Sequence, residues 1–308
     1  MAGESKHSLR IVCCSDTHGK HREVEVPEGD IFIHAGDFTH FGKLDDAIDF
    51  NDWLGDENIF GGFKVKIVVN GNHESNAPWK KDVRSILSNA VFLRNEAFEL
   101  DIGDEIEQED DFGASLVDDK DSNTKNSSDT ENQNTLDDSS KDPNEPPNFV
   151  TDTAQSTQKK DKVLKIYGSE FYWPMESKNP YYGLIPSDTD ILVVHGPAKG
   201  YVDGGVGCPA LLNRVNSLVG NENSGSWNML DMKSVVNTMK NWISPSTDQE
   251  MFSPDRLLLV VSGHIHKAHG VSDMAVKSRN SRVTFVNAAI ANQGYQKGWD
   301  PVQIDFQL

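Results

Sequence analysis

Short apolar runs, separated by polar segments, recur along the chain. Five runs are largely apolar and rich in valine, isoleucine and leucine, which is typical of strands buried on both faces of a sheet; they are Leu9–Ser15, Ile31–His34, Lys64–Asn70, Ile191–His195 and Leu257–Ser262. Further strands are predicted at Val91–Leu93, Ala97–Leu100, Val163–Tyr167, Arg282–Asn287 and Val302–Phe306.

Between some of these runs, apolar residues recur at helical spacing, and we expect each helix to turn this face toward the core. The four predicted faces are Leu44, Ala47, Ile48, Asn51 and Leu54; Val83, Ile86 and Leu87; Leu211, Leu212, Val215, Leu218 and Val219; and Met232, Val235, Val236, Met239 and Ile243. Strands and helices alternate without an internal repeat, which predicts a layered α/β domain. Surface loops are expected at Gly220–Trp227 and Ser244–Ser253, around the last helix.

One acidic segment interrupts this pattern. The chain has 308 residues and a formal net charge of −19, and residues 104–162 hold 17 acidic against 6 basic side chains. The segment has few aromatic, valine or isoleucine residues and no apolar periodicity, so we expect it to be disordered. The sequence therefore predicts one domain made of residues 1–103 and 162–308, with residues 104–161 inserted at a turn between two strands. A solvated insertion is the favoured interpretation, and a phosphorylation platform or an acidic docking segment is the alternative.

The composition of the chain indicates its cellular compartment and its classes of partner. Cys13 and Cys14 are adjacent and Cys208 stands alone, so the sequence has neither a disulfide framework nor a zinc-finger spacing. The first residues are polar, and no run approaches the roughly 18 apolar residues of a membrane span. These features predict a cytoplasmic protein without a membrane partner. The acidity also disfavours nucleic acid as a partner, because proteins that bind it usually present basic surfaces.

Polar side chains follow the five buried runs, at the point where each run ends. These residues are Asp16 and His18, Asp37, Asn72 and His73, His195, and His264 and His266. Ligands of an open α/β sheet bind beyond the carboxyl ends of its strands, so we expect these side chains to meet at one edge. Glycines at positions 36, 71, 196 and 263 allow tight turns and close approach beside them.

The residue types in this set indicate a metal site. An isolated histidine or aspartate after a strand is more often a hydrogen-bonded or capping residue than a ligand. Here imidazoles, carboxylates and one amide recur together after buried strands. Divalent Zn, Mn and Fe favour imidazole mixed with carboxylate oxygen, while Mg suits the oxygen ligands, so the metals are left open among these four.

The motifs in this order resemble the calcineurin-like metallophosphoesterase superfamily. They are Asp16-Thr-His18, Gly36-Asp37, Gly71-Asn-His-Glu74, His195-Gly and Gly263-His-Ile-His266. Closer similarity is to the metallophosphoesterase-domain-containing subfamily, through His34–Thr39, Phe50–Gly55, Ile166–Ser169 and His195–Pro197. The resemblance implies two mixed β-sheets packed face to face with helices outside. It also implies a site for two divalent metal ions, with Asp16, His18 and His266 on one ion, Asn72, His195 and His264 on the other, and Asp37 on both.

This set suits hydrolysis of phosphate esters. Two cations about 3.5–4 Å apart need a carboxylate between them, and a water held by both loses a proton near neutral pH and attacks phosphorus. His73 is expected to protonate the leaving oxygen as general acid. Glu74 is expected either to orient His73 or to begin the next helix. His34 is expected to lie in the core or to contact the metal ligands from behind. Asn287 is a candidate for lining the edge of the site where the substrate binds.

The sequence around Asp37 narrows the substrate. Protein phosphatases of the superfamily carry Asp-Arg-Gly after the second motif, whereas Phe38, Thr39 and His40 follow Asp37 here. The pattern also resembles class III cyclic-nucleotide phosphodiesterases, which predicts a small phosphodiester substrate, with a cyclic nucleotide as one candidate. The alternatives are a phosphomonoesterase or protein phosphatase of the same superfamily, a nuclease, and a catalytically idle metal-binding scaffold.

Overall fold

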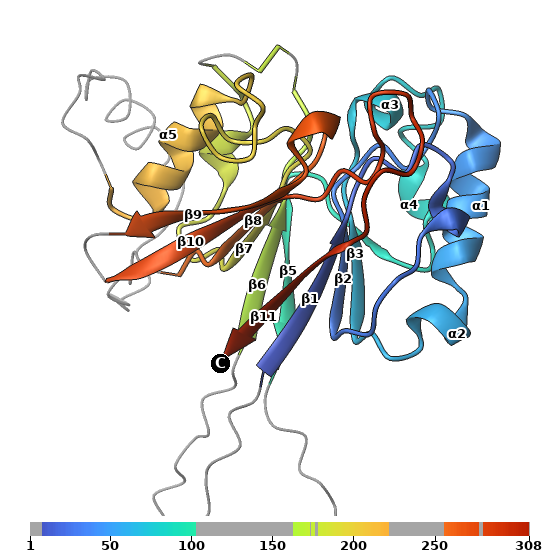
Figure 1. Cartoon of the computed structure of the whole chain (residues 1–308), viewed down its shortest axis with the longest axis horizontal. Coiled ribbons are helices and arrows are strands. Elements are labelled where there is room, and N and C mark those ends of the chain that lie inside the picture. Colours follow the sequence, from blue (N-terminus) through green and yellow to red (C-terminus); the bar gives the residue numbers. More distant parts are fainter. Residues whose placement is uncertain are drawn as a thin grey trace, which may run out of the picture. The chain divides into compact units, whose positions relative to one another are not determined.

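Two β-sheets with helices outside them form the part of the chain that the structure describes (Figure 1). The structure is a computed structural model, and it describes residues 8–102, 163–172, 174–175, 178–221, 256–276 and 280–307. All of these residues belong to one compact unit.

The first sheet has five strands in the order β11-β1-β2-β3-β4. Strands β1 to β4 pair in parallel, and β11 pairs antiparallel with β1 at the edge. Their bounds are β1 Ser8–Cys14, β2 Ile31–His34, β3 Val65–Val68, β4 Val91–Phe92 and β11 Val302–Gln307. Each of these strands was predicted from its apolar run.

The second sheet has six strands in the order β5-β6-β7-β8-β10-β9. Strands β6, β7, β8 and β10 are parallel, while β5 and β9 pair antiparallel at the edges. The bounds are β5 Glu96–Asp101, β6 Val163–Gly168, β7 Ile191–Val193, β8 Leu259–Ser262, β9 Gly270–Val276 and β10 Ser281–Asn287. Strand β9 was not predicted, because most of its side chains are exposed or half-buried and its sequence lacks a long apolar run.

Helices cover the outer faces of both sheets. In Figure 1, α1 to α4 lie beside the first sheet and α5 lies beside the second. Their bounds are α1 Leu44–Leu54, α2 Glu57–Phe60, α3 Asn72–Ser75, α4 Val83–Ile86 and α5 Pro209–Leu218. Short 3-10 turns lie at His21–Glu23, Tyr182–Leu184 and His266–Ala268. No helix in the described ranges has both the length and the apolar character needed to cross a membrane.

Three apolar clusters hold these layers together, and the strands divide their side chains between them. Ile11 and Cys13 of β1 enter the cluster between the two sheets, while Val12 and Cys14 face α1, α2 and α4. In β7, Ile191 and Val193 join the central cluster, and Leu192 packs toward α5. Because successive strand residues point to opposite faces, a strand that is apolar throughout has to be covered on both sides. The predicted sandwich of two mixed sheets flanked by helices is confirmed.

Helix α1 was predicted, but its buried face was predicted only in part. Leu44 and Ile48, which we placed toward the core, are 43% and 47% exposed. Ala47 and Leu54 are buried as predicted, and Phe50 and Trp53 are buried although they were not predicted to be. Aromatic side chains bury the largest apolar areas, so Phe50 and Trp53 decide which way the helix faces.

The acidic segment 104–161 lies outside the described residues, as do the predicted helix at 232–243 and the loop at 244–253. The described strands on either side of the acidic segment, β5 and β6, pair antiparallel from Glu96 opposite Gly168 to Asp101 opposite Val163. The division of the chain into a domain and an insertion stays a prediction.

Candidate metal centre

The carboxyl ends of five parallel strands from the two sheets lead to one cavity. Asp16 follows β1, Asp37 follows β2, Asn72 follows β3, His195 follows β7, and His264 with His266 follow β8. The cavity has a volume of about 320 Å³, and His18, Asp37, Asn72, His73, His264 and His266 are among the residues that line it. The structure therefore places the sequence-predicted ligands together.

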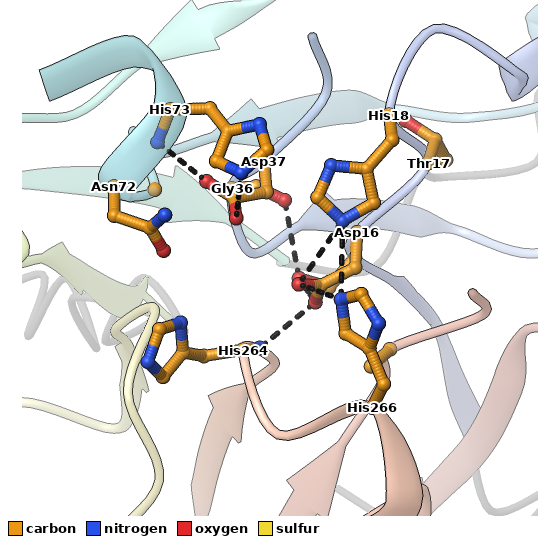
Figure 2. A network of polar contacts seen from close by, with 12 residues as sticks. Asp16, Thr17, His18, Gly36, Asp37, Asn72, His73, His264 and His266 are labelled. Atoms are coloured by element: carbon orange, nitrogen blue, oxygen red, sulfur yellow. Dashed lines mark hydrogen bonds and ion pairs between the residues drawn. The ribbon is translucent and has the colours of Figure 1, made fainter. Parts of the chain in front are cut away.

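One group of possible ligands surrounds Asp16. His266 Nε2 lies 3.2 Å from Asp16 Oδ1 and 3.1 Å from His18 Nε2. The other carboxylate oxygen, Oδ2, accepts hydrogen bonds from Ser15 Oγ at 2.7 Å and from the His264 N–H at 2.9 Å. Figure 2 shows the side chains of Asp16, His18 and His266 pointing toward one another. One oxygen is thus held by protein donors, and the other faces two imidazoles.

A second group surrounds Asp37. His195 Nε2 lies 3.3 Å from Asp37 Oδ2 and 3.2 Å from Asn72 Oδ1. Asp37 Oδ1 accepts a hydrogen bond of 2.9 Å from the His73 N–H (Figure 2). His264 completes this group. Its ligand nitrogen lies within 4.8 Å of the carboxylate oxygen of Asp37 and of the ligand nitrogen of His195. The carboxylate again has one oxygen held by the backbone and one turned toward nitrogen ligands.

Backbone carbonyls orient two of the imidazoles. His195 Nδ1 lies 2.7 Å from the Ala35 carbonyl oxygen, and His266 Nδ1 lies 2.9 Å from that of Asn292. A carbonyl only accepts hydrogen bonds, so each Nδ1 carries a proton, and Nε2 is the nitrogen that would offer a lone pair to a metal ion once it has lost its own proton. Such an outer hydrogen bond is the usual partner of a metal-binding histidine.

Burial and charge set the protonation of these groups. Burial lowers the pKa of His18 and of His264 to about 4, so both are neutral at pH 7. Burial also works against protonation of His195, but the Asp37 carboxylate beside it outweighs burial and raises its pKa to about 9. For Asp16, burial opposes ionisation, yet the hydrogen bond to His266 and the neighbouring imidazoles hold its pKa below the usual range. The carboxylates are charged, and they attract positive charge to the site.

Several site residues hold unusual backbone conformations. Nine described residues other than glycine have a positive φ. Four of them line the cavity, namely His18, Asp37, His264 and Tyr295, and two more, Asp16 and Phe41, contact residues that line it. Such conformations cost on the order of 1–3 kcal/mol each, and they cluster at functional sites. Asp16, Asp37 and His264 have this conformation shortly after β1, β2 and β8, where it turns the chain at the strand end.

Two glycines are needed for close approach. A side chain at Gly71 would collide with the Asp37 carboxylate, and one at Gly263 would collide with Ser15 and with the Asp16 carboxylate. The motif glycines at these two positions therefore leave room for the carboxylates.

His73, the predicted general acid, lies beside the second group. Its Nε2 is 3.8 Å from Asp37 Oδ2. On the other side of the ring, Nδ1 lies 2.9 Å from the Phe41 N–H and 3.1 Å from the Thr39 carbonyl oxygen. One neighbour donates and the other accepts, so Nδ1 has a partner whether or not it carries a proton. These contacts fix the ring so that Nε2 lies on the side of Asp37.

Glu74 has a position that neither of its two expected roles describes in full. It belongs to the short helix α3, but its buried carboxylate reaches back to the loop after β2. Oε2 accepts hydrogen bonds of 2.9 Å from the N–H groups of Asp37 and Gly71, and Oε1 accepts from the N–H and the hydroxyl of Thr39. Burial and the nearby Asp37 charge raise the pKa of Glu74 to about 7. Glu74 fixes the loops that carry Asp37 and Asn72.

His34 and Asn287 both lie behind the cavity. His34 is fully buried, and its Nε2 lies 3.1 Å from Thr17 Oγ1. Asn287, also fully buried, donates through Nδ2 to the carbonyl oxygens of Val202 and Ile265, and its Oδ1 accepts from the Ala289 N–H. Its polar atoms hold the loop that carries His264 and His266.

Three residues at or beside the cavity were not predicted from the sequence. Tyr295 and Lys267 line it, and Phe41 stacks on the ring of His73. The signal for Phe41 was its place four residues after Asp37. Tyr295 lies in a polar turn that contains no motif residue, so the sequence offered no signal for it.

Divalent cations fit this donor set. Asp16, His18 and His266 form one group whose ligand atoms all lie within 4.8 Å of one another, and Asp37, His195 and His264 form another. His195 Nε2 faces two oxygen acceptors, and His18 and His266 present their Nε2 atoms to each other. A cation would satisfy these converging lone pairs together, and imidazole with carboxylate is a set that suits such metals.

Comparisons with known proteins agree with this geometry. Residues 9–268 match the family model described as calcineurin-like phosphoesterase. The chain is 28% identical, over 308 aligned residues, to metallophosphoesterase domain-containing protein 1 of Homo sapiens and of Mus musculus, covering 96% of this chain and 70% of each of those proteins. It is also 28% identical to a UPF0046 protein of Caenorhabditis elegans, covering 96% of this chain and 74% of that protein.

Proposed function

The chain belongs to the calcineurin-like phosphoesterase family, and we propose that it hydrolyses a small phosphodiester with two divalent metal ions. Membership of the family supports hydrolysis of phosphoric esters with divalent metals. The number of ions, the roles of the individual residues and the preference for diesters are our proposals.

The observation that carries the proposal is the convergence of two groups of ligands on one cavity. Asp16, His18 and His266 would hold one ion. The other would be held by His195, His264 and Asn72, whose Oδ1 lies 3.2 Å from His195 Nε2. Asp37 would contact both ions, because it groups with His195 and His264 and also with His18 and His73.

The ions and the residues around them would have separate roles in the reaction. When bound, the ions would activate water as the nucleophile and stabilise charge on the phosphoryl oxygens. His73 would deliver a proton from Nε2 to the leaving oxygen, which is the role of a general acid. The Phe41 N–H and the Thr39 carbonyl would keep its Nδ1 hydrogen-bonded before and after this transfer. Glu74 would hold Asp37 in place through its bonds to the backbone.

The charge of the cavity supports a diester. A monoester dianion carries more negative charge than a diester, and arginine is the residue best shaped to grip such a phosphate. The described residues that line the cavity include Lys267 but no arginine. With Asp37 among the same residues, positive charge beyond the ions is scarce, which favours the singly charged ester.

The test compares two esters with the same leaving group. The full chain, supplied with Mn²⁺, is expected to hydrolyse bis(p-nitrophenyl) phosphate with a kcat/KM at least about tenfold above that for p-nitrophenyl phosphate. The reverse order would exclude the diester preference but keep the hydrolase. A screen of 2′,3′- and 3′,5′-cyclic nucleotides with Mn²⁺, Fe²⁺, Zn²⁺ and Mg²⁺ would then test the cyclic-nucleotide candidate.

His73→Ala tests the proton donor and the scaffold alternative together. Loss of a general acid costs about 10²–10⁴-fold, and the cost is expected at the low end for p-nitrophenolate, which needs little protonation. His269→Ala is the matched control, since His269 stacks on Trp299 and is not among the residues that line the cavity. If the wild-type protein and His73→Ala hydrolyse the diester at the same rate, His73 is not the acid; if neither does so above background, the protein is a scaffold.

A further inference from the structure

We propose that Phe41 and Tyr295 bind an aromatic group of the substrate, such as a nucleobase, by stacking. This inference rests on the proposed phosphodiesterase function and narrows its substrate to esters that carry a planar ring. Neither residue is a metal ligand, and neither belongs to the motifs that define the site.

Tyr295 stands on the wall of the cavity. Its ring meets His18 at 4.7 Å and His266 at 5.4 Å between centroids, nearly perpendicular to both. The turn that carries it is built by Asn292, whose Oδ1 accepts from the N–H groups of Gly294 and Gln296. The Asn292 carbonyl also accepts from the Tyr295 N–H and lies 2.9 Å from His266 Nδ1. The aromatic ring is therefore fixed relative to the ligands.

Phe41 continues this aromatic surface past His73. The two rings stack at 4.8 Å with an interplanar angle of 13°. The Phe41 ring also lies 6.2 Å from Tyr295, tilted by 53°, so that the two form a corner. Although one face of Phe41 covers His73, the side chain is 66% exposed. Most of the side chain is therefore open to solvent, next to His73 and Tyr295, which line the cavity.

The backbone holds both rings at a cost. Phe41 and Tyr295 have φ values of 57° in the left-handed region, which bulky residues rarely adopt. An exposed phenylalanine gains little from burial that would compensate for such strain. Strained residues at a cavity mouth indicate a binding role, and an open aromatic face is the feature that a planar ligand group recognises.

The place of the corner indicates which part of the substrate it meets. His73 Nε2 must approach the leaving oxygen to protonate it, so the group on that oxygen passes beside the rings that flank His73. Phe41 and Tyr295 are these rings, with centroids 4.8 Å and 6.3 Å from that of His73. Aromatic stacking accepts any base, because every base has a π-face. Phe41 and Tyr295 would therefore bind any planar ring of the substrate and would not distinguish one base from another.

Equilibrium binding tests this without any turnover. The full chain with Mn²⁺ is titrated calorimetrically with adenosine 5′-monophosphate and with ribose 5-phosphate, which share the phosphate and the sugar. We expect about tenfold tighter binding of the nucleotide, the size typical of one stacked base. Phe41→Leu and Tyr295→Leu should each reduce nucleotide affinity about fivefold or more and change ribose 5-phosphate affinity less than twofold.

Two controls separate stacking from general damage. Tyr295→Phe keeps the ring and should keep the preference for the nucleotide. Leu184→Ala removes an exposed apolar side chain that is not among the residues lining the cavity and should change neither affinity. Equal affinity of the wild-type protein for both probes, including no binding of either, overturns the inference, and so does an equal loss of both in the leucine variants. Failure of diester hydrolysis would instead overturn the proposed function, whatever the affinities.

Discussion

The two sheets bring different chemistry to the cavity. The loops after β1, β2 and β3 supply both carboxylates, the amide of Asn72 and the proposed acid His73, together with His18. The loops after β7 and β8 of the other sheet supply His195, His264 and His266 and no acidic side chain to the two ligand groups. One half therefore carries the negative charge, and the other carries imidazoles whose protonation depends on that charge.

This difference means that neither half makes the site alone. The Asp37 carboxylate raises the pKa of His195 across the boundary between the sheets, and the His264 N–H donates to Asp16 across the same boundary. Each proposed ion would take ligands from both sheets. The packing of the central apolar cluster, which contains Ile11 of β1 and Leu259 of β8, sets the distances on which metal binding depends.

The largest effect is expected from the carboxylate half. Asp37→Asn removes the charge shared by both proposed ions, and since such ions contribute several kcal/mol to the transition state, kcat should fall by about 10⁴-fold. The bound metal, measured by mass spectrometry after gel filtration, should fall for both ions. Asp273→Asn, in the surface pair with Arg282 on the far strand β9, is the matched control and should change kcat less than twofold. Retention of both ions in Asp37→Asn would refute its shared role.

A smaller loss is expected from the imidazole half. His266→Ala removes a neutral ligand of one proposed ion and leaves Asp37, His195 and His264 in place. We expect metal content to fall by about half and kcat by about 10²-fold, less than for Asp37→Asn. A loss equal to that of Asp37→Asn would show that the two halves are not different in the way described.

A substitution at Glu74 should loosen the loop that carries Asp37 without changing a proposed metal ligand. Both carboxylate oxygens of Glu74 accept hydrogen bonds from backbone N–H groups, and in Glu74→Gln an amide NH₂ replaces one of them. The N–H groups that faced this oxygen lose their acceptor, which should lower the free energy of unfolding by about 1–3 kcal/mol. Denaturant unfolding should show this loss, and kcat should fall about tenfold, within the range for outer-layer partners of metal ligands. Glu57→Gln, on the exposed first turn of α2, is the control. Unchanged stability would mean that Glu74 does not brace the Asp37 loop.

The smallest effect concerns stability in acid. Burial lowers the pKa of His34 to about 3, from an ordinary value of 6.5. Below pH 6.5 the unfolded chain binds a proton at His34 and the folded chain does not, so folding stability falls with falling pH by about 1.4 kcal/mol per unit from this residue. Denaturant unfolding of metal-free protein between pH 6.5 and 5 should show a shallower slope for His34→Gln. An identical slope would contradict the burial of a neutral ring.

Much of the fold was predictable because its strands are covered on both faces. A run such as Ile31–His34 has to be buried throughout, and its apolar residues show this without knowledge of its partners. Strand β9 was missed for the opposite reason, since its exposed positions hide the pattern. The face of α1 was right at Ala47 and Leu54 but wrong at Leu44 and Ile48, because helical spacing alone does not weigh these two residues against the larger Phe50 and Trp53.

The candidate site was predictable where it depends on residue type and place along a strand. Asp16, Asp37 and His264 follow apolar runs, and the structure brings them together. The roles of Glu74 and Asn287 depend on which backbone atoms come within reach after folding, which local sequence does not encode. Tyr295 reaches the cavity only because β10 returns the chain beside β8, so its place depends on the sheet and not on its neighbours.

The central claim is that side chains from both sheets hold two divalent ions on either side of Asp37. Anomalous diffraction from crystals of the full chain soaked in Mn²⁺ tests it directly. We predict two peaks about 3.5–4 Å apart, one beside Asp16, His18 and His266 and the other beside Asn72, His195 and His264. A single peak, or two peaks that do not share Asp37, would contradict it.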